Sequence, residues 1–167
     1  MRISFDLDEV LFVSPDVCET EDALPFPLNR IYRERLRRDT VRLIHELQTQ
    51  GFEVWIYTSS FRPRQYLRSL FRKYGIRFDG IVNAERHLAE VQAGHLQPLP
   101  QKMPGHYRIS LHVDDEDVII ENGKRYGFRT CKVCEPDGEW VEKVLAEANR
   151  VRTLEEQLQQ DRLSGSP

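Results

Sequence analysis

Short apolar runs alternate with longer segments of helical periodicity along the chain. Five apolar runs predict β-strands, at residues 2–6, 52–57, 80–83, 107–113 and 129–133. Four periodic segments predict helices, at residues 30–50, 62–74, 116–126 and 138–162. Because strands and helices alternate, the pattern favours the α/β class, a three-layer sandwich around a central parallel five-stranded sheet.

The length of 167 residues suits a single domain, which we place at 1–162, followed by a flexible tail at 163–167. No apolar run reaches the ~18 residues of a membrane span, and the N-terminus lacks the basic and apolar regions of a secretion signal. Three cysteines, an odd number, favour a reducing compartment. We therefore expect a soluble cytoplasmic protein, and we interpret Cys131 and Cys134 as structural thiols rather than a redox or metal site.

An Asp-x-Asp pair, Asp6 and Asp8, ends the first predicted strand. Alternate residues of a strand share a face, so the two carboxylates point the same way if the strand continues. Carboxylates this close repel each other unless a cation or a shared proton holds them, and a hard divalent cation is the natural solution. The structural alternative is an acidic strand end without chemistry.

Three further polar motifs follow in order. Thr58 and Ser59 come after the second strand, Lys102 lies in a Pro-flanked loop, and Asp114 and Asp115 end the strand at 107–113. Each has a structural alternative. The Thr-Ser pair and the Asp-Asp pair could cap the helices that follow them, and the lysine could be solvated.

The ordered set Asp-x-Asp, Thr/Ser, Lys and Asp-Asp, spread over about residues 2–135, resembles the four motifs of the haloacid-dehalogenase (HAD) superfamily. The resemblance implies the strand order 5-4-1-2-3 and phosphate-ester hydrolysis. Asp6 would be the nucleophile that forms an aspartyl-phosphate, and Asp8 the general acid and base. Thr58, Ser59 and Lys102 would bind the phosphoryl group.

The resemblance also implies Mg²⁺ as the cofactor. Its ligands would be Asp6, the backbone carbonyl of Asp8, and the pair Asp114 and Asp115. Alignment with the family's usual Gly-Asp makes Asp115 the direct ligand and Asp114 the water-mediated one, although which of them binds directly stays open. The longer family form has another acid four residues after that Asp, where this chain has Ile119.

The gaps between the motifs are too short for a cap domain, because units below ~40 residues rarely fold alone. We therefore expect an open site, with the segment 11–29 as a flap that sets selectivity. The phosphorylated substrate, whether a small molecule, a phosphoprotein or a nucleic-acid end, is not resolved, and a homo-oligomer could cover the site. Residues 30–73 hold eleven Lys or Arg against four Asp or Glu. We interpret these as solvated helix faces rather than a nucleic-acid surface.

Two functions of different classes remain. The first is a Mg²⁺-dependent phosphatase for phosphate monoesters. The alternative is a catalytically silent module of the same fold that binds a phosphorylated partner or serves as a regulatory subunit. The presence of Asp8 favours the enzyme, since a binding module would not need this carboxylate.

Overall fold

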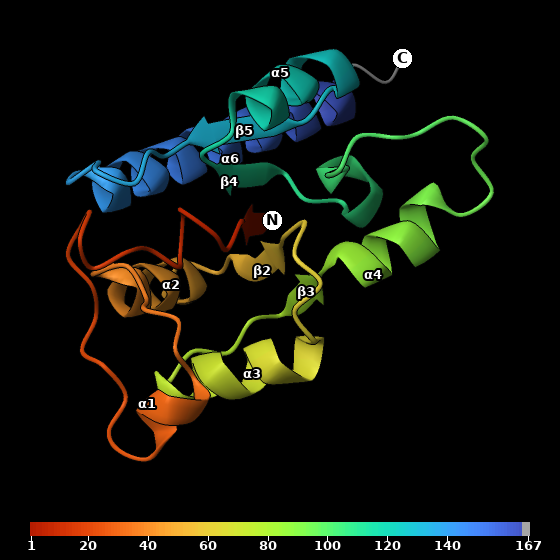
Figure 1. Cartoon of the computed structure of the whole chain (residues 1–167). Coiled ribbons are helices and arrows are strands. Elements are labelled where there is room, and N and C mark those ends of the chain that lie inside the picture. The colour runs from red at the N-terminus through yellow and green to blue at the C-terminus, as the bar shows by residue number, and fades with distance from the viewer. Residues whose placement is uncertain (165–167) are drawn as a thin grey trace.

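The computed structural model describes residues 1–164. Its strands are β1 (Arg2–Phe5), β2 (Glu53–Tyr57), β3 (Gly80–Val82), β4 (Leu111–Asp114) and β5 (Arg129–Lys132) (Figure 1). Its α-helices are α1 (Leu28–Ile31), α2 (Thr40–Thr49), α3 (Arg64–Lys73), α4 (Ala84–His87), α5 (Asp117–Tyr126) and α6 (Trp140–Ser164). Two tighter or wider turns complete the set, the π-helical η1 (Leu88–Gln92) and the 3₁₀-helical η2 (Pro104–Tyr107).

The five strands form one parallel sheet in the order β3-β2-β1-β4-β5. This is the predicted order read from the other edge, so the predicted α/β fold class is confirmed. β1 lies in the centre, where Ile3 pairs with Val54 of β2 and with Leu111 of β4. Both faces of β1 are covered, since Ile3 and Phe5 on one face and Ser4 on the other are all at 0% exposure.

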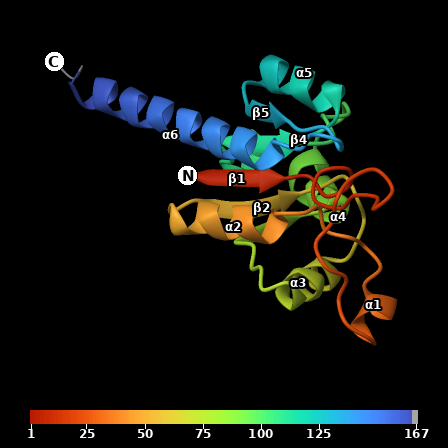
Figure 2. The same cartoon turned by 90° about the vertical axis from the view of Figure 1, so that its left-hand side faces the viewer.

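Side chains of β2 alternate between two apolar clusters on opposite faces of the sheet. Val54 and Ile56 pack in the larger cluster, to which α2, α3 and α6 contribute. Trp55 and Tyr57 pack in the smaller one, which residues from η1 and η2 complete. Figure 2 shows α2 and α6 running alongside the central strands, and α5 next to β5. The strict alternation explains why a five-residue strand buries both faces.

The predicted helix at 30–50 is wrong in its first half. Between α1 and α2 the chain is not helical, because Leu36 and Arg37 form isolated β-bridges with Phe12 and Thr20. Asp39 then adopts a left-handed backbone with φ of 65° before α2 begins. The apolar spacing of this segment therefore serves bridge pairing in its first half and a helix only in its second.

A buried guanidinium explains why this stretch stays extended. Arg37 is only 2% exposed, and its Nη2 donates to the backbone carbonyls of Cys134, Glu135 and Asp137 at 2.7–2.9 Å. The same guanidinium lies 4.8 Å from the ring centre of Trp140. Arg37 thus fastens the segment before α2 to the loop before α6, a long-range contact that local periodicity does not encode.

The predicted strand at 107–113 begins late. Tyr107 closes η2, and Arg108 adopts a left-handed conformation with φ of 54° and ψ of 37°. β4 starts only at Leu111 and includes Asp114, which pairs with Lys132 of β5. The first acid of the Asp-Asp pair is therefore the last residue of the strand, not part of the following loop.

The left-handed backbone of Arg108 yields a stability prediction. A side chain with Cβ in this conformation costs about 1–2 kcal/mol, whereas glycine adopts it freely. Because Arg108 is exposed, we expect Arg108→Gly to raise the free energy of unfolding by about 0.5–1 kcal/mol in urea denaturation. Arg108→Ala, which removes the same side chain but keeps Cβ, should give no gain. An equal effect of the two variants would contradict the interpretation.

The structure differs from the prediction at the start of the expected flap and at the end of the last helix. Leu11, Phe12 and Val13, the start of the expected flap, are buried in the structure, and Phe12 stacks on Phe71 with ring centres 5.6 Å apart. α6 runs to Ser164, two residues past its predicted end, and the rest of the expected tail lies outside the described residues. Among the described helices, none combines the length and apolar character that crossing a bilayer requires.

Candidate active site

Asp6 and Asp114 meet because β1 and β4 are neighbouring parallel strands. Asp6 directly follows β1, and its backbone N–H donates to the carbonyl of Val113 at 2.9 Å. Asp114 is the next residue and ends β4. The carboxyl ends of parallel strands share one edge of the sheet, where ligands of open α/β folds bind. The topology therefore places the first and fourth motifs side by side.

Lys102 bridges these two carboxylates. Its Nζ lies 2.9 Å from Oδ1 of Asp6 and 2.6 Å from Oδ2 of Asp114, and the residue is 1% exposed. Burial lowers the pKa of Lys102, but the two carboxylates outweigh this effect and raise it overall, so the ammonium stays charged. Burial raises the pKa of Asp6, against the opposing effect of Lys102. The predicted alternative of a solvated lysine is wrong.

Tyr57, at the end of β2, anchors the loop that carries Lys102. The Tyr57 hydroxyl accepts a hydrogen bond from the backbone N–H of Met103 at 2.8 Å. The same hydroxyl forms a hydrogen bond of 2.6 Å with Nδ1 of His87. Burial raises the pKa of Tyr57, so the hydroxyl stays protonated and can serve both partners.

His112 holds Asp114 from the opposite side to the lysine. Nε2 of His112 lies 2.8 Å from Oδ2 of Asp114, and Nδ1 lies 2.7 Å from Oγ of Ser4. Burial raises the pKa of Asp114, but the hydrogen bond from His112 and the charge of Lys102 bring it down to about 2. Asp114 is thus ionised, which requires Nε2 to donate to it. The apolar strand pattern around the buried His112 does not reveal this contact.

Asp6, Asp114 and Asp115 form a group of carboxylates suited to a cation. Each can offer one oxygen such that all three lie within 4.8 Å of one another. Burial and the neighbouring Asp114 raise the pKa of Asp115 to about 7. Three carboxylates face a single ammonium here, and Oδ1 of Asp6 is buried without a well-formed hydrogen bond. This excess of buried negative oxygen fits a hard divalent cation such as Mg²⁺.

Asp8 points to a different partner. Its two carboxylate oxygens each accept a hydrogen bond of 2.8 Å from the guanidinium of Arg62, a bidentate pair. Arg62 also donates to Oγ of Ser60 at 2.9 Å and lies 3.4 Å from Glu34. The hydrogen bond to Asp8 and its charge raise the pKa of Arg62. Asp8 is exposed, so in this conformation it lies at the mouth of the site rather than among the buried carboxylates.

Thr58 and Ser59 differ in their exposure. Thr58 is 1% exposed, and its hydroxyl oxygen accepts the backbone N–H of Ser60 at 3.1 Å, which leaves the hydroxyl hydrogen to donate. Ser59 is exposed. Neither residue caps α3, because the N-cap position is Pro63 and forms no side-chain hydrogen bond. The helix-capping alternative for this motif is therefore wrong.

The structure brings Asp6, Lys102, Asp114 and Asp115 into one buried cluster, whereas Asp8 pairs with Arg62 outside it. Sequence patterns predicted no role for Tyr57 or Glu34 and no partner for Arg62. No local signal marks these contacts, since each joins residues at least 28 positions apart. Cys131 is buried and Cys134 is exposed, and both are free thiols.

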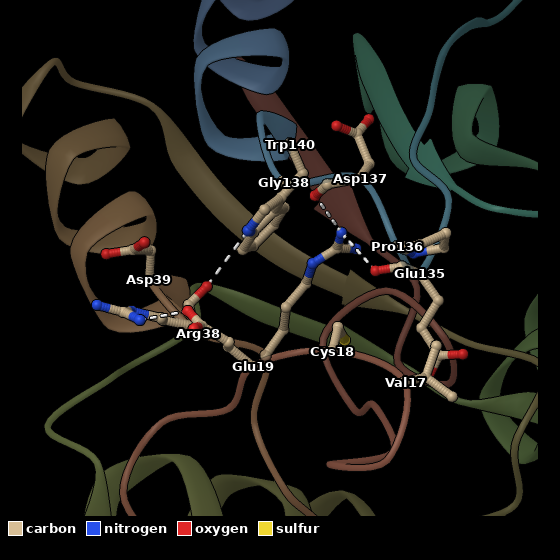
Figure 3. A pocket seen from close by; sticks show the side chains of 11 residues that line it. Val17, Cys18, Glu19, Arg38, Asp39, Glu135, Pro136, Asp137, Gly138 and Trp140 are labelled. Carbon is tan, nitrogen blue, oxygen red and sulfur yellow. Dashed lines mark hydrogen bonds and ion pairs between the residues drawn. The ribbon is translucent and has the colours of Figure 1, made fainter.

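A separate cavity of about 380 Å³ lies beside the segment before α2 (Figure 3). Cys18, Glu19, Arg38 and Trp140 line it, together with residues of the loop at 135–138. In Figure 3 the indole of Trp140 forms one wall, and its Nε1 donates to the carbonyl of Arg38 at 3.2 Å. None of the seven predicted site residues lines this cavity, so it is not the predicted phosphate site.

The solved structures that resemble this chain include two distant matches. One is a crystal structure of a HAD-superfamily hydrolase, subfamily IA, variant 1, from Geobacter sulfurreducens. It has 13% identity, covers 78% of this chain and 88% of that chain, and gives a TM-score of 0.49. The other is an uncharacterized protein from Listeria monocytogenes, with 20% identity, 77% and 75% coverage and a TM-score of 0.47.

Neither a scan against protein-family models nor a search of curated proteins gives a match.

Proposed function

We propose that this protein is a Mg²⁺-dependent phosphatase that hydrolyses phosphate monoesters through an aspartyl-phosphate on Asp6. The observation that carries the proposal is Lys102, whose buried Nζ lies 2.9 Å from Asp6 and 2.6 Å from Asp114. A buried ammonium between two carboxylates, beside a third, supports a site that neutralises a phosphoryl group during its transfer. Burying charged groups costs desolvation free energy, which a cluster with a purely structural role would avoid with apolar side chains.

In the first step, a carboxylate oxygen of Asp6 attacks phosphorus while the bond from phosphorus to the ester oxygen breaks. Asp8 gives its proton to the leaving oxygen. In the second step, Asp8 takes a proton from water, whose oxygen attacks phosphorus and releases Asp6 and inorganic phosphate. Because Arg62 holds both oxygens of Asp8, this pair must open before Asp8 reaches the leaving oxygen.

The remaining residues bind charge. Lys102 neutralises the Asp6 carboxylate and the phosphoryl oxygens, and the Thr58 hydroxyl and Ser59 donate hydrogen bonds to them. Asp6, Asp114, Asp115 and the backbone carbonyl of Asp8 would hold Mg²⁺, which supplies positive charge to the phosphoryl oxygens when bound. Burial and the charge of Asp114 raise the pKa of Asp115 to about 7, a cost that a bound cation would relieve, which supports Asp115 as a direct ligand. Asp114 is already engaged by Lys102 and His112.

The test is release of phosphate from phenyl phosphate, with and without Mg²⁺, by the wild type and Asp8→Asn. We expect turnover that requires Mg²⁺ and that falls at least about a hundredfold in Asp8→Asn, the usual contribution of a general acid. Asp16→Asn is the matched control, because Asp16 is an exposed acid of the same early segment without a predicted role. Equal rates for the two variants would remove Asp8 from the mechanism.

The same fold can also serve a silent module that binds a phosphorylated partner. In that case no ester is hydrolysed, yet beryllofluoride with Mg²⁺ still raises the melting temperature of the wild type. A shift that depends on Asp6, without turnover of any phosphate ester, would favour the binding module. Absence of both turnover and shift would contradict both functions.

A further inference from the structure

A small apolar groove opens between the two loops predicted to bind phosphate. Its volume is about 220 Å³, and its lining includes Ser59 and Gln101, the residue before Lys102. Its walls include Phe61, Leu88 and Leu99. The groove therefore shares Ser59 with the proposed phosphate site, and Gln101 places it next to Lys102 along the chain.

The far wall of the groove is held in place by specific contacts. Asn83 caps α4 by accepting the N–H of Arg86 at 3.1 Å, and α4 continues into the π-helical turn η1. Such wide turns are frequent at functional sites. The side chain of Gln92, in η1, accepts the N–H of Leu99 at 2.8 Å and donates to the carbonyl of Gln97 at 3.1 Å. These bonds fold the loop at 93–101 back onto η1 and fix Leu99 in the wall.

The groove is apolar and carries no formal charge. No Asp, Glu, Lys or Arg is among its lining residues. His87 lies in the wall, and burial lowers its pKa, which favours the neutral ring. Phe61 is 69% exposed and Leu88 50% exposed, so two large apolar side chains stand open to solvent beside the site. Apolar side chains gathered in a hollow next to a polar site are typical of ligand pockets.

From these contacts we propose that the groove binds the aromatic ring of the leaving alcohol, so that the substrates are phosphomonoesters of uncharged aromatic alcohols. This inference rests on the proposed function. The volume admits one ring but lies below the ~300 Å³ at which pockets for larger ligands begin. The lack of charged lining residues disfavours leaving groups with a second phosphate or carboxylate. Phe61 supplies an aromatic face for an offset or edge-on contact with the ring.

The experiment compares benzyl phosphate with ethyl phosphate, two esters whose alcohols leave with similar ease, by phosphate release in Mg²⁺. We expect kcat/KM of the wild type to be at least about tenfold higher for benzyl phosphate, because burying the ring in the groove lowers the free energy of the bound ester. Phe61→Ala and Leu88→Gln should lower kcat/KM for benzyl phosphate by about tenfold and leave ethyl phosphate within about twofold. Both residues are exposed, so these variants should fold.

Leu96→Gln is the matched control, because Leu96 lies in the loop at 93–101, is fully exposed and does not line the groove. This variant should leave kcat/KM unchanged for both esters. A second measurement uses calorimetric binding of benzylphosphonate and ethylphosphonate, which cannot be hydrolysed. Benzylphosphonate should bind the wild type about tenfold more tightly, and Phe61→Ala should remove the difference.

The outcomes separate the two proposals. Turnover of both esters at equal kcat/KM, or an equal loss for both esters in Phe61→Ala, would overturn the groove assignment and leave the phosphatase intact. A phosphonate difference that survives Phe61→Ala and Leu88→Gln would also overturn it. Failure to hydrolyse either ester with Mg²⁺ present would contradict the proposed function, and the inference with it.

Discussion

Asp6→Asn abolishes phosphate release, by a factor of at least about 10⁴, because the amide cannot form the covalent intermediate. Two neighbouring carboxylates are poor substitutes, since Asp8 is held by Arg62 and Asp114 by Lys102 and His112. The measurement is kcat for phenyl phosphate at saturating Mg²⁺. Asp6→Asn should also lose the rise in melting temperature that beryllofluoride gives the wild type.

The folded state should tolerate this change. Asp6 is buried, and burial raises its pKa, so its charge is costly in the fold. An isosteric amide removes that cost along with one partner of Lys102, and we expect the urea midpoint to shift only slightly. If Asp6→Asn kept a tenth of wild-type activity while folding normally, Asp6 would not be the nucleophile. A collapse of the fold would instead be visible in the urea transition, which separates the two causes.

The sheet and the buried cluster could be predicted from sequence because both depend on short-range pattern. Apolar runs that end in Asp6 and Thr58 define strands and the polar residues at their carboxyl ends at the same time. Once the strands are parallel, those ends must share one edge. The lysine needed the family pattern, since nothing in its loop distinguishes Lys102 from a solvated side chain.

The rest depends on contacts between distant segments. The predicted helix at 30–50 failed because Arg37 reaches carbonyls about a hundred residues away, which no local periodicity reports. The pairing of Asp8 with Arg62 spans 54 positions. The sequence marks Tyr57 only as a strand residue, and its hydrogen bond with Met103 in the loop of Lys102 is seen only in the structure. The sequence therefore indicated which chemical groups lie at the sheet edge, but not which of them form hydrogen bonds or ion pairs with one another.

Loss of the buried ammonium should have the largest effect on stability. Lys102→Met fills most of the same volume but leaves the ionised Asp114 and the buried Asp6 without their shared cation. Removing one partner of a buried ion pair costs about 3–5 kcal/mol. We expect the free energy of unfolding, measured in urea with a chelator, to fall by about this amount. Phosphatase activity should be lost as well.

Two comparisons test this explanation. Lys143→Met removes an exposed ammonium 3.2 Å from Asp137, and exposed pairs are worth at most about 1 kcal/mol, so its midpoint should hardly move. Asp114→Asn in the Lys102→Met background should recover part of the lost stability, because it removes the uncompensated charge. Mg²⁺ should likewise stabilise Lys102→Met more than the wild type, since the cation replaces the missing positive charge among the same carboxylates. Equal stability of Lys102→Met and Lys143→Met would show that Lys102 does not neutralise these carboxylates. That result would also contradict the proposal that this cluster binds a phosphoryl group.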